Sequence, residues 1–305
     1  MLFELKYKIW KWVKKKMKIR SWEQFRSSIK REIDQKRYKQ TYTSDDIIAL
    51  MKSMGLKKGA TVFVHSSWDE FYNYQGTINE FIDAILAEIG AEGTLLMPSY
   101  PLLRKPDSIF SISNTPTAAG MIAETFRTYP NVKRSINRHS VCSLGPMSNF
   151  LTHEHQYSIT CWDEKSPYYK LAELNALIFS FGLGKYFIGT SIHCANSMLK
   201  DEIPYFARFF QKKTTLKVKL EDKTILCQES YDSEDDFFSY ITDRSLKKFI
   251  RHLDKSKYTR KKLSNLTANM YDAKYLINSA INLGRKGIVV YMRPVPSKSL
   301  FENIT

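Results

Sequence analysis

The 305-residue sequence predicts an α/β fold with a mostly parallel central sheet, flanking helices and antiparallel hairpin additions toward the C-terminus. The first observation behind this class is an apolar run, ATVFVHSS at 60–67, followed by an amphipathic stretch, NEFIDAILAEIG at 79–90, and a second apolar run, GTLLMPSY at 93–100. Strand, helix and strand in this order form a βαβ unit, whose two strands run parallel. The second observation is TTLKVKLEDKTILC at 214–227, where alternating residues flank a polar turn, as they do in a hairpin.

A helix is expected to open the main domain, in TYTSDDIIALMKSMG at 41–55. Thr43 or Ser44 can cap it, acidic residues favour its positive end, and Gly55 can end it. Further along, ALIFSFGLGKYFIGTS at 176–191 contains another apolar strand.

The C-terminal third is expected to add a helix and a strand. The acidic segment YDSEDD at 231–236 introduces a helix that would carry apolar residues, namely Phe237, Phe238, Ile241, Phe249 and Ile250. The segment GIVVYM at 287–292 predicts the final strand.

The net charge of +16 is concentrated at the N-terminus. Residues 1–40 contain ten lysines, four arginines and four acidic residues (14 − 4 = +10), whereas the other 265 residues carry only +6. This separates an N-terminal extension, 1–40, from a domain at 41–305, and it argues against a nucleic-acid-binding domain.

The extension begins with a basic amphipathic pattern. Leu2, Leu5, Ile9 and Trp12 recur at three- and four-residue steps among lysines, which predicts an amphipathic helix. Such a helix suits an anionic membrane surface, and it equally suits packing on the domain or on a second subunit of a homo-oligomer.

Several functional classes lack sequence support. The four cysteines show no CxxC spacing, and no secretory signal precedes them, so we expect reduced thiols in the cytoplasm, with the basic helix as an attachment to the inner membrane face. No apolar run approaches the ~20 residues of a membrane span. His153 and His155 lack zinc-site spacing, so no metal is expected. The sequence also lacks GxGxxG after the first strand, GxxxxGK[ST] and GxSxG, which removes the best support for dinucleotide, nucleoside triphosphate and serine-hydrolase sites.

Four clusters of hydroxyl and histidine residues remain at expected loops: HSS at 65–67, RSINRHS at 134–140, KSP at 165–167 and TSIH at 190–193. Each has a structural alternative. HSS can cap a helix, RSINRHS can form an exposed turn, a Ser-Pro pair often starts a helix, and the histidine of TSIH can be a satisfied, partly buried residue at a strand end.

In this order and spacing, the sequence resembles the aminoglycoside 3-N-acetyltransferase family, which includes sugar-modifying relatives. The matching segments, between about Thr43 and Phe210, are VFVHSS, GTLLMPSY, RSINRHSVCSLG, DEKSPYYKL and TSIHCAN. The resemblance implies a coenzyme A-dependent N-acyltransferase that uses acetyl-CoA or another acyl-CoA and transfers the acyl group to an amine or amino sugar.

The resemblance also implies roles for individual residues. His193 corresponds to the family's general base, Thr190 lies beside it, and Asn196 occupies the position of the family's glutamate. The residues implied to contact the coenzyme are Ser66, Ser67, Thr94, Arg134, Ser135 and Ser140.

Two departures from the family pattern bear on function. Arg138 replaces a proline, which would reshape the loop or add a phosphate contact. Asn196 can accept a hydrogen bond from the imidazole but brings no charge to an imidazolium, so both an active enzyme and a degenerate, non-catalytic binding subunit stay open. Asp201 and Glu202 could replace the missing carboxylate only if the chain turned back.

The charge of the domain bears on the acceptor. Because the domain is mildly basic, we expect an amino sugar on an anionic carrier, in surface polysaccharide assembly, with an aminoglycoside antibiotic as the alternative.

Overall fold

The computed structural model describes residues 22–104, 107–233 and 240–301. The chain divides into two compact units, residues 1–41 and 42–305. In the first unit, the described part contains α2 (Trp22–Arg37), whose last turn is basic, as suits the negative end of a helix. The amphipathic helix predicted for residues 1–20 lies outside the described residues.

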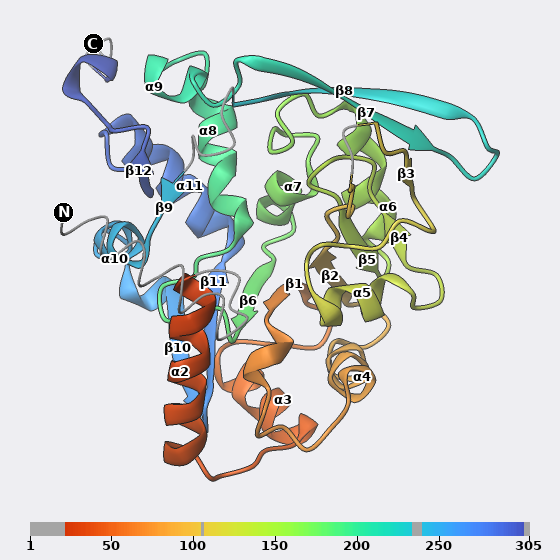
Figure 1. Ribbon diagram of the computed structural model, residues 1–305, viewed down its shortest axis with the longest axis vertical. Helices are drawn as coiled ribbons and strands as arrows, with labels where there is room; N and C mark the ends of the chain where they lie inside the picture. Colours follow the sequence, from red (N-terminus) through yellow and green to blue (C-terminus); the bar gives the residue numbers. More distant parts are fainter. Residues whose placement is uncertain (1–21, 105–106, 234–239, 302–305) are drawn as a thin grey trace, which may run out of the picture. The chain divides into compact units, whose positions relative to one another are not determined.

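The second unit is built on a seven-stranded sheet of order β10-β11-β6-β1-β2-β5-β4 (Figure 1). Its three central strands are parallel: β6 (Leu177–Phe181), β1 (Thr61–Ser66) and β2 (Thr94–Pro98). The outer strands run antiparallel to their neighbours, and they are β5 (Val141–Leu144), β4 (Lys133–Arg134), β11 (Leu266–Asp272) and β10 (Tyr258–Leu263). The βαβ unit predicted from residues 60–100 is therefore confirmed, with α4 (Ile78–Ile89) as its helix.

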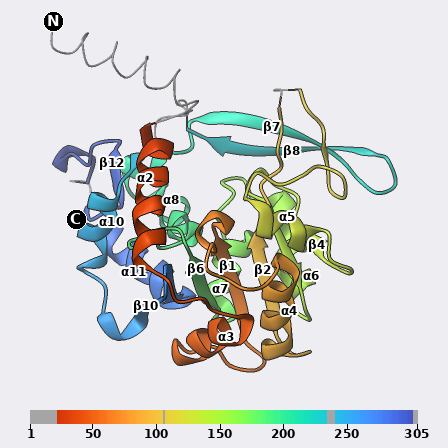
Figure 2. The ribbon, with the colours of Figure 1, turned by 60° about the horizontal axis from the view of Figure 1, so that its bottom comes forward.

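Helices cover both faces of the sheet, which is why its central strands are apolar on both sides (Figures 1 and 2). Side chains alternate along β1, so that Val62 and Val64 pack in one core and Phe63 in the other. The first core includes α3 (Ser44–Ser53), α4 and α5 (Met121–Arg127). The second includes α7 (Pro167–Glu173), α8 (Cys194–Leu199) and α11 (Ala273–Arg285).

Local signals explain where several helices start. Thr43 and Asp46 form a reciprocal capping box at the start of α3, as the sequence predicts, and Gly55 follows the helix at a φ of +110°. Ser166 caps α7 by accepting a hydrogen bond from the backbone of Tyr169 at 3.2 Å. The Ser-Pro pair therefore does start a helix.

The predicted hairpin is present as β7 (Lys212–Lys219) and β8 (Ile225–Asp232), joined by β3 (Phe110–Ser111) in a three-stranded sheet. The helix expected after the acidic segment begins later than predicted. It is α10 (Asp243–Ile250), capped by Thr242, because Thr242 and Ser245 form a capping box there.

Two residues, one expected in that helix and one in the acidic segment before it, lie in strands. Ile241 belongs to β9 (Tyr240–Ile241), which pairs with β12 (Tyr291–Arg293), and Asp232 ends β8. Phe237 and Phe238 lie outside the described residues. Across the described ranges, no helix combines the length and the apolar character that crossing a membrane requires.

Candidate active site

The site forms beyond the carboxyl ends of the parallel strands, where open α/β sheets bind their ligands. The chain leaving β2 carries Tyr100, and the chain leaving β6 leads to a short 3-10 helix, η3 (Thr190–His193), which continues directly as α8. His193 and Asn196 are three residues apart on this continuous helical segment, so their side chains project from the same side. The Thr190 hydroxyl lies 3.1 Å from the hydroxyl of Tyr100.

These residues line a cavity of about 400 Å³, which is within the size range of small-molecule sites. The lining residues are Tyr100, His139, Trp162, Thr190, His193, Asn196, Phe209, Asp232, Ser233 and Tyr291. The structure thus brings together the three residues predicted to be catalytic, Thr190, His193 and Asn196.

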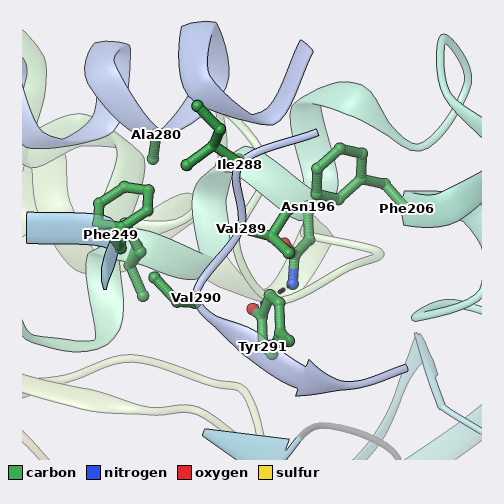
Figure 3. Close-up of a pocket in the computed structure, with 10 residues that line it drawn as sticks. Asn196, Phe206, Phe249, Ala280, Ile288, Val289, Val290 and Tyr291 are labelled. Carbon is green, nitrogen blue, oxygen red and sulfur yellow. Dashed lines mark hydrogen bonds between the residues drawn. The ribbon is translucent and has the colours of Figure 1, made fainter. Parts of the chain in front are cut away.

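A tyrosine contacts the ring of His193. Nδ1 of His193 lies 2.6 Å from the hydroxyl of Tyr291, and Nδ2 of Asn196 donates to the same hydroxyl at 2.5 Å. Figure 3 shows the amide of Asn196 directed at Tyr291. Tyr291 follows His193 by 98 residues and comes from the predicted final strand. The sequence offered no signal for it, because neither spacing nor motif connects the two positions.

The carboxylates closest in sequence are occupied elsewhere. Asp201 pairs with Lys200, and Glu202 forms an ion pair with Arg285 at 2.8 Å. Among the described residues, Asp232 is the acidic one that lines the cavity, and it comes from the end of the hairpin.

Burial keeps His193 uncharged. Desolvation, and to a smaller extent the neighbouring His139, lowers the pKa of His193 to about 3. The hydroxyl of Tyr291, whose own pKa burial raises, brings no negative charge to offset this. At neutral pH the imidazole is therefore free to accept a proton, but it is a weak base.

A second histidine, which the sequence interpretation did not assign a role, belongs to the same cavity. His139 comes from RSINRHS, and its ring centroid lies 4.3 Å from that of Trp162, which lies 5.1 Å from that of His193. Burial, and then the charge of Arg138, lowers the pKa of His139 to about 4. The RSINRHS segment, which contains His139, was the feature of the sequence that could have indicated this residue.

Three of the residues predicted to contact the coenzyme bond to the fold itself. The Arg134 guanidinium donates to the carbonyls of Ile112, Thr115 and Ser99 at 3.1, 2.5 and 2.8 Å. The Ser135 hydroxyl lies 2.8 Å from Nδ1 of His155. The Ser140 hydroxyl donates to the carbonyl of Ser135 at 2.6 Å. All three are buried, and none lines the cavity, so the structure gives them a role in shaping the loop.

The other three residues predicted to contact the coenzyme, Ser66, Ser67 and Thr94, lie at different points of the fold. Thr94 begins β2, at the opposite end of the strand from Tyr100, and its hydroxyl accepts a hydrogen bond from the backbone of Met147 at 3.1 Å. Ser66 ends β1, and the backbone N–H of Ser67 donates to the carbonyl of Phe181 at 3.0 Å. Ser67 precedes a short 3-10 helix but makes no side-chain cap, and neither serine lines the cavity of His193.

A second cavity, of about 540 Å³, adjoins the first and shares Tyr100, His139 and Asp232 with it. It also contains two arginines, Arg104 and Arg138. The Nε atom of Arg138 is buried and has no hydrogen-bond partner in the described part of the chain. The site therefore joins the chamber at His193, which Asp232 lines, to a second chamber that also contains two arginines.

Comparison with known proteins identifies the family. The family model described as aminoglycoside 3-N-acetyltransferase matches residues 63–283, which is more than half of the chain. The chain belongs to the aminoglycoside 3-N-acetyltransferase family. The matched region contains His193 and, except for Val62, all of the five segments that suggested the resemblance.

Two relatives match part of this chain, and the identity and coverage of each match are as follows. It is 32% identical over 158 residues to the SPbeta prophage-derived aminoglycoside N(3')-acetyltransferase-like protein YokD of Bacillus subtilis, and the match covers 44% of this chain and 56% of that protein. It is 28% identical over 162 residues to aminoglycoside N(3)-acetyltransferase IV of Salmonella, with 52% and 60% covered. The chain thus spans less than two thirds of either relative.

Solved structures confirm the predicted fold class. Aminoglycoside acetyltransferase AAC(3)-Xa matches with a TM-score of 0.70 at 17% identity, covering 86% of this chain and 99% of that one. AAC-IIIb, solved in a binary complex with CoASH, matches with a TM-score of 0.69 at 18% identity, covering 82% and 98%.

Proposed function

We propose that this protein transfers an acetyl group from acetyl-coenzyme A to an amine of an aminoglycoside. The observation that carries the proposal is the placement of His193, the histidine of the TSIH cluster, as an uncharged imidazole in a ligand-sized cavity. Membership of the family and the names of the two relatives support the reaction and the acceptor class.

The proposed chemistry is direct transfer. The acceptor nitrogen attacks the thioester carbon while His193 takes a proton from that nitrogen. The carbon–sulfur bond then breaks, and the leaving sulfur takes up that proton from His193, which gives the free thiol and restores the neutral imidazole. The buried indole N–H of Trp162, which has no partner among the described residues, is available to a carbonyl oxygen on which negative charge develops. Thr190 is held beside the base by Tyr100.

The two chambers suit the two substrates. Arg104 and Arg138 would hold the phosphates of the coenzyme, because phosphate oxygens are the acceptors that an unpaired guanidinium favours. The unpartnered Nε of Arg138 is the observation that supports this fit. Asp232, which lines both chambers, would bind an ammonium group of the acceptor.

The acceptor proposed here differs from the one the charge distribution suggested. The basic net charge is the observation that favours an amino sugar in surface polysaccharide assembly. The relatives, in contrast, are named for aminoglycosides. We therefore favour the aminoglycoside alternative. A cytoplasmic location, attachment of residues 1–20 to an anionic membrane, and a homo-oligomer held by that segment are proposals that rest on the sequence alone.

Thiol release tests the proposal. The full-length protein is mixed with acetyl-CoA and, in separate reactions, with gentamicin, apramycin or a nucleotide-linked amino sugar, and free thiol is measured. We expect release with at least one aminoglycoside and none with the nucleotide sugar. Release with the nucleotide sugar alone would restore the polysaccharide role. Binding of coenzyme A, seen as a thermal shift, without release for any amine would instead support the non-catalytic binding subunit.

A further inference from the structure

The hydroxyl of Tyr291, a buried residue, lies between two polar groups. Tyr291 is 4% exposed, its ring centroid is 4.7 Å from that of Phe209, and its oxygen is within 2.6 Å of both Nδ1 of His193 and Nδ2 of Asn196. Figure 3 shows the apolar residues around the Asn196–Tyr291 pair. Because buried polar groups are normally hydrogen-bonded, we expect the phenol oxygen and its proton to bond to these two neighbours.

The three groups can form only certain hydrogen bonds. An amide nitrogen has donors and no acceptor, so the phenol oxygen accepts from Asn196. The phenol proton then needs an acceptor, and Nδ1 of His193 is the one that the structure provides. An imidazole that accepts at Nδ1 carries its proton on Nε2 when the ring is neutral.

We infer that Asn196, acting through Tyr291, holds resting His193 in the tautomer whose proton is on Nε2. Nε2 has no partner among the described residues, and His193 lines the cavity. The resting histidine therefore presents an N–H to the ligand and must change tautomer before it can take a proton through Nε2. Tyr291 is a positioning residue in this scheme. The inference rests on the proposed role of His193 as the base.

A carboxylate at position 196 would reverse the direction of this chain of hydrogen bonds. A carboxylate only accepts, so it would take the proton of the Tyr291 hydroxyl, and the phenol oxygen would then accept from Nδ1–H of His193. That leaves Nε2 unprotonated and ready to act as a base. In a serine-protease triad, an amide in place of the carboxylate lowers kcat about 10⁴-fold through the wrong tautomer.

The test is the tautomer itself, read from the ring nitrogen shifts of ¹⁵N-histidine-labelled full-length protein at pH 8. The His193 signals are assigned by their loss in His193→Gln. We expect Nε2–H in the wild type, Nδ1–H in Asn196→Asp, and a mixture in Tyr291→Phe, where the phenol proton is gone. Asn149→Asp, an exposed amide-to-carboxylate change, serves as the matched control and should leave the wild-type tautomer.

Activity gives a second measurement. With an accepted amine, Asn196→Asp should raise kcat at least tenfold, which stays within the factor of about 10⁴ above. An Nδ1–H tautomer in the wild type would overturn the inference, and so would an unchanged tautomer in Asn196→Asp. If Asn196→Asp does not fold, an unchanged tautomer in Tyr291→Phe overturns it. If the tautomers are as expected but no variant releases thiol, the inference stands and the proposed function fails.

Discussion

Mild acid is expected to destabilise this protein because four histidines are held in their uncharged form, two of them buried (His65 and His155) and two partly buried in the cavity lining (His139 and His193). Burial lowers the pKa of His65, His155 and His193 to about 3 and that of His139 to about 4, from an ordinary value of 6.5. His65 packs between Phe63 and Phe187, and its Nε2 has no partner in the described part of the chain. With these pKa values, none of the four is expected to carry a proton near pH 6 in the resting folded protein.

The size of the effect follows from proton linkage. Below pH 6.5 the unfolded chain binds protons at these positions and the folded chain does not, so the stability present above pH 6.5 falls as the pH falls toward 3–4. Between pH 7.5 and 5.5 each histidine lowers the free energy of unfolding by about 1.4 kcal/mol, and the four together by roughly 5 kcal/mol. That is comparable with the whole stability of a typical domain, about 5–15 kcal/mol.

Urea unfolding at pH 7.5 and 5.5 measures this difference, and His65→Leu tests its origin. Leucine fills the apolar place without a proton site, so the variant should lose about 1.4 kcal/mol less than the wild type between the two pH values. Phe179→Leu, in the core, is the control and should weaken the protein equally at both. Equal free energies of unfolding at pH 7.5 and 5.5 in the wild type would refute the reasoning.

Three further outcomes are expected. His193→Ala should lower kcat 10²- to 10⁴-fold and leave coenzyme A affinity within a few-fold; retention of a tenth of kcat would contradict a general base. Arg138→Gln should weaken coenzyme A binding about tenfold in calorimetry, as loss of a charged hydrogen bond does, while equal affinity would remove it from the phosphate site. Deletion of residues 1–20 should release the protein from anionic vesicles without affecting acetylation, because each basic residue near such a surface contributes about 1 kcal/mol to the free energy of binding. Equal co-sedimentation of the full-length and truncated proteins would refute the membrane proposal.

The sequence predicted the elements whose signals are local. Alternation and apolar runs identified the central strands, and capping residues identified the start of α3, because each depends on neighbours within a few positions. The start of α10 was misjudged since an acidic run resembles a helix start, whereas the actual cap, Thr242, lies beyond that run. No local feature of the sequence distinguished the acidic run from the actual helix start at Thr242.

The site was predictable only where the motif residues themselves line it. Thr190, His193 and Asn196 share one helical segment, so one motif places all three. Tyr291 and Asp232 reach the cavity from strands that fold back over it, and such long-range contacts depend on the whole topology. For this reason the partner of His193 could not be read from the residues next to it.

The RSINRHS segment shows why a motif residue need not touch the ligand. Arg134 fixes the chain between Ser99 and Thr115 through three carbonyls, and Ser140 ties the loop back to Ser135. Breaking buried bonds to a charged group costs about 1.5–3 kcal/mol each, so these contacts hold the loop firmly. The residues of the segment that line the two chambers are Arg138 and His139. The buried residues of the motif position those two side chains, and a contact with the substrate is therefore expected from Arg138 and His139 rather than from the arginine and serines that the motif made most conspicuous.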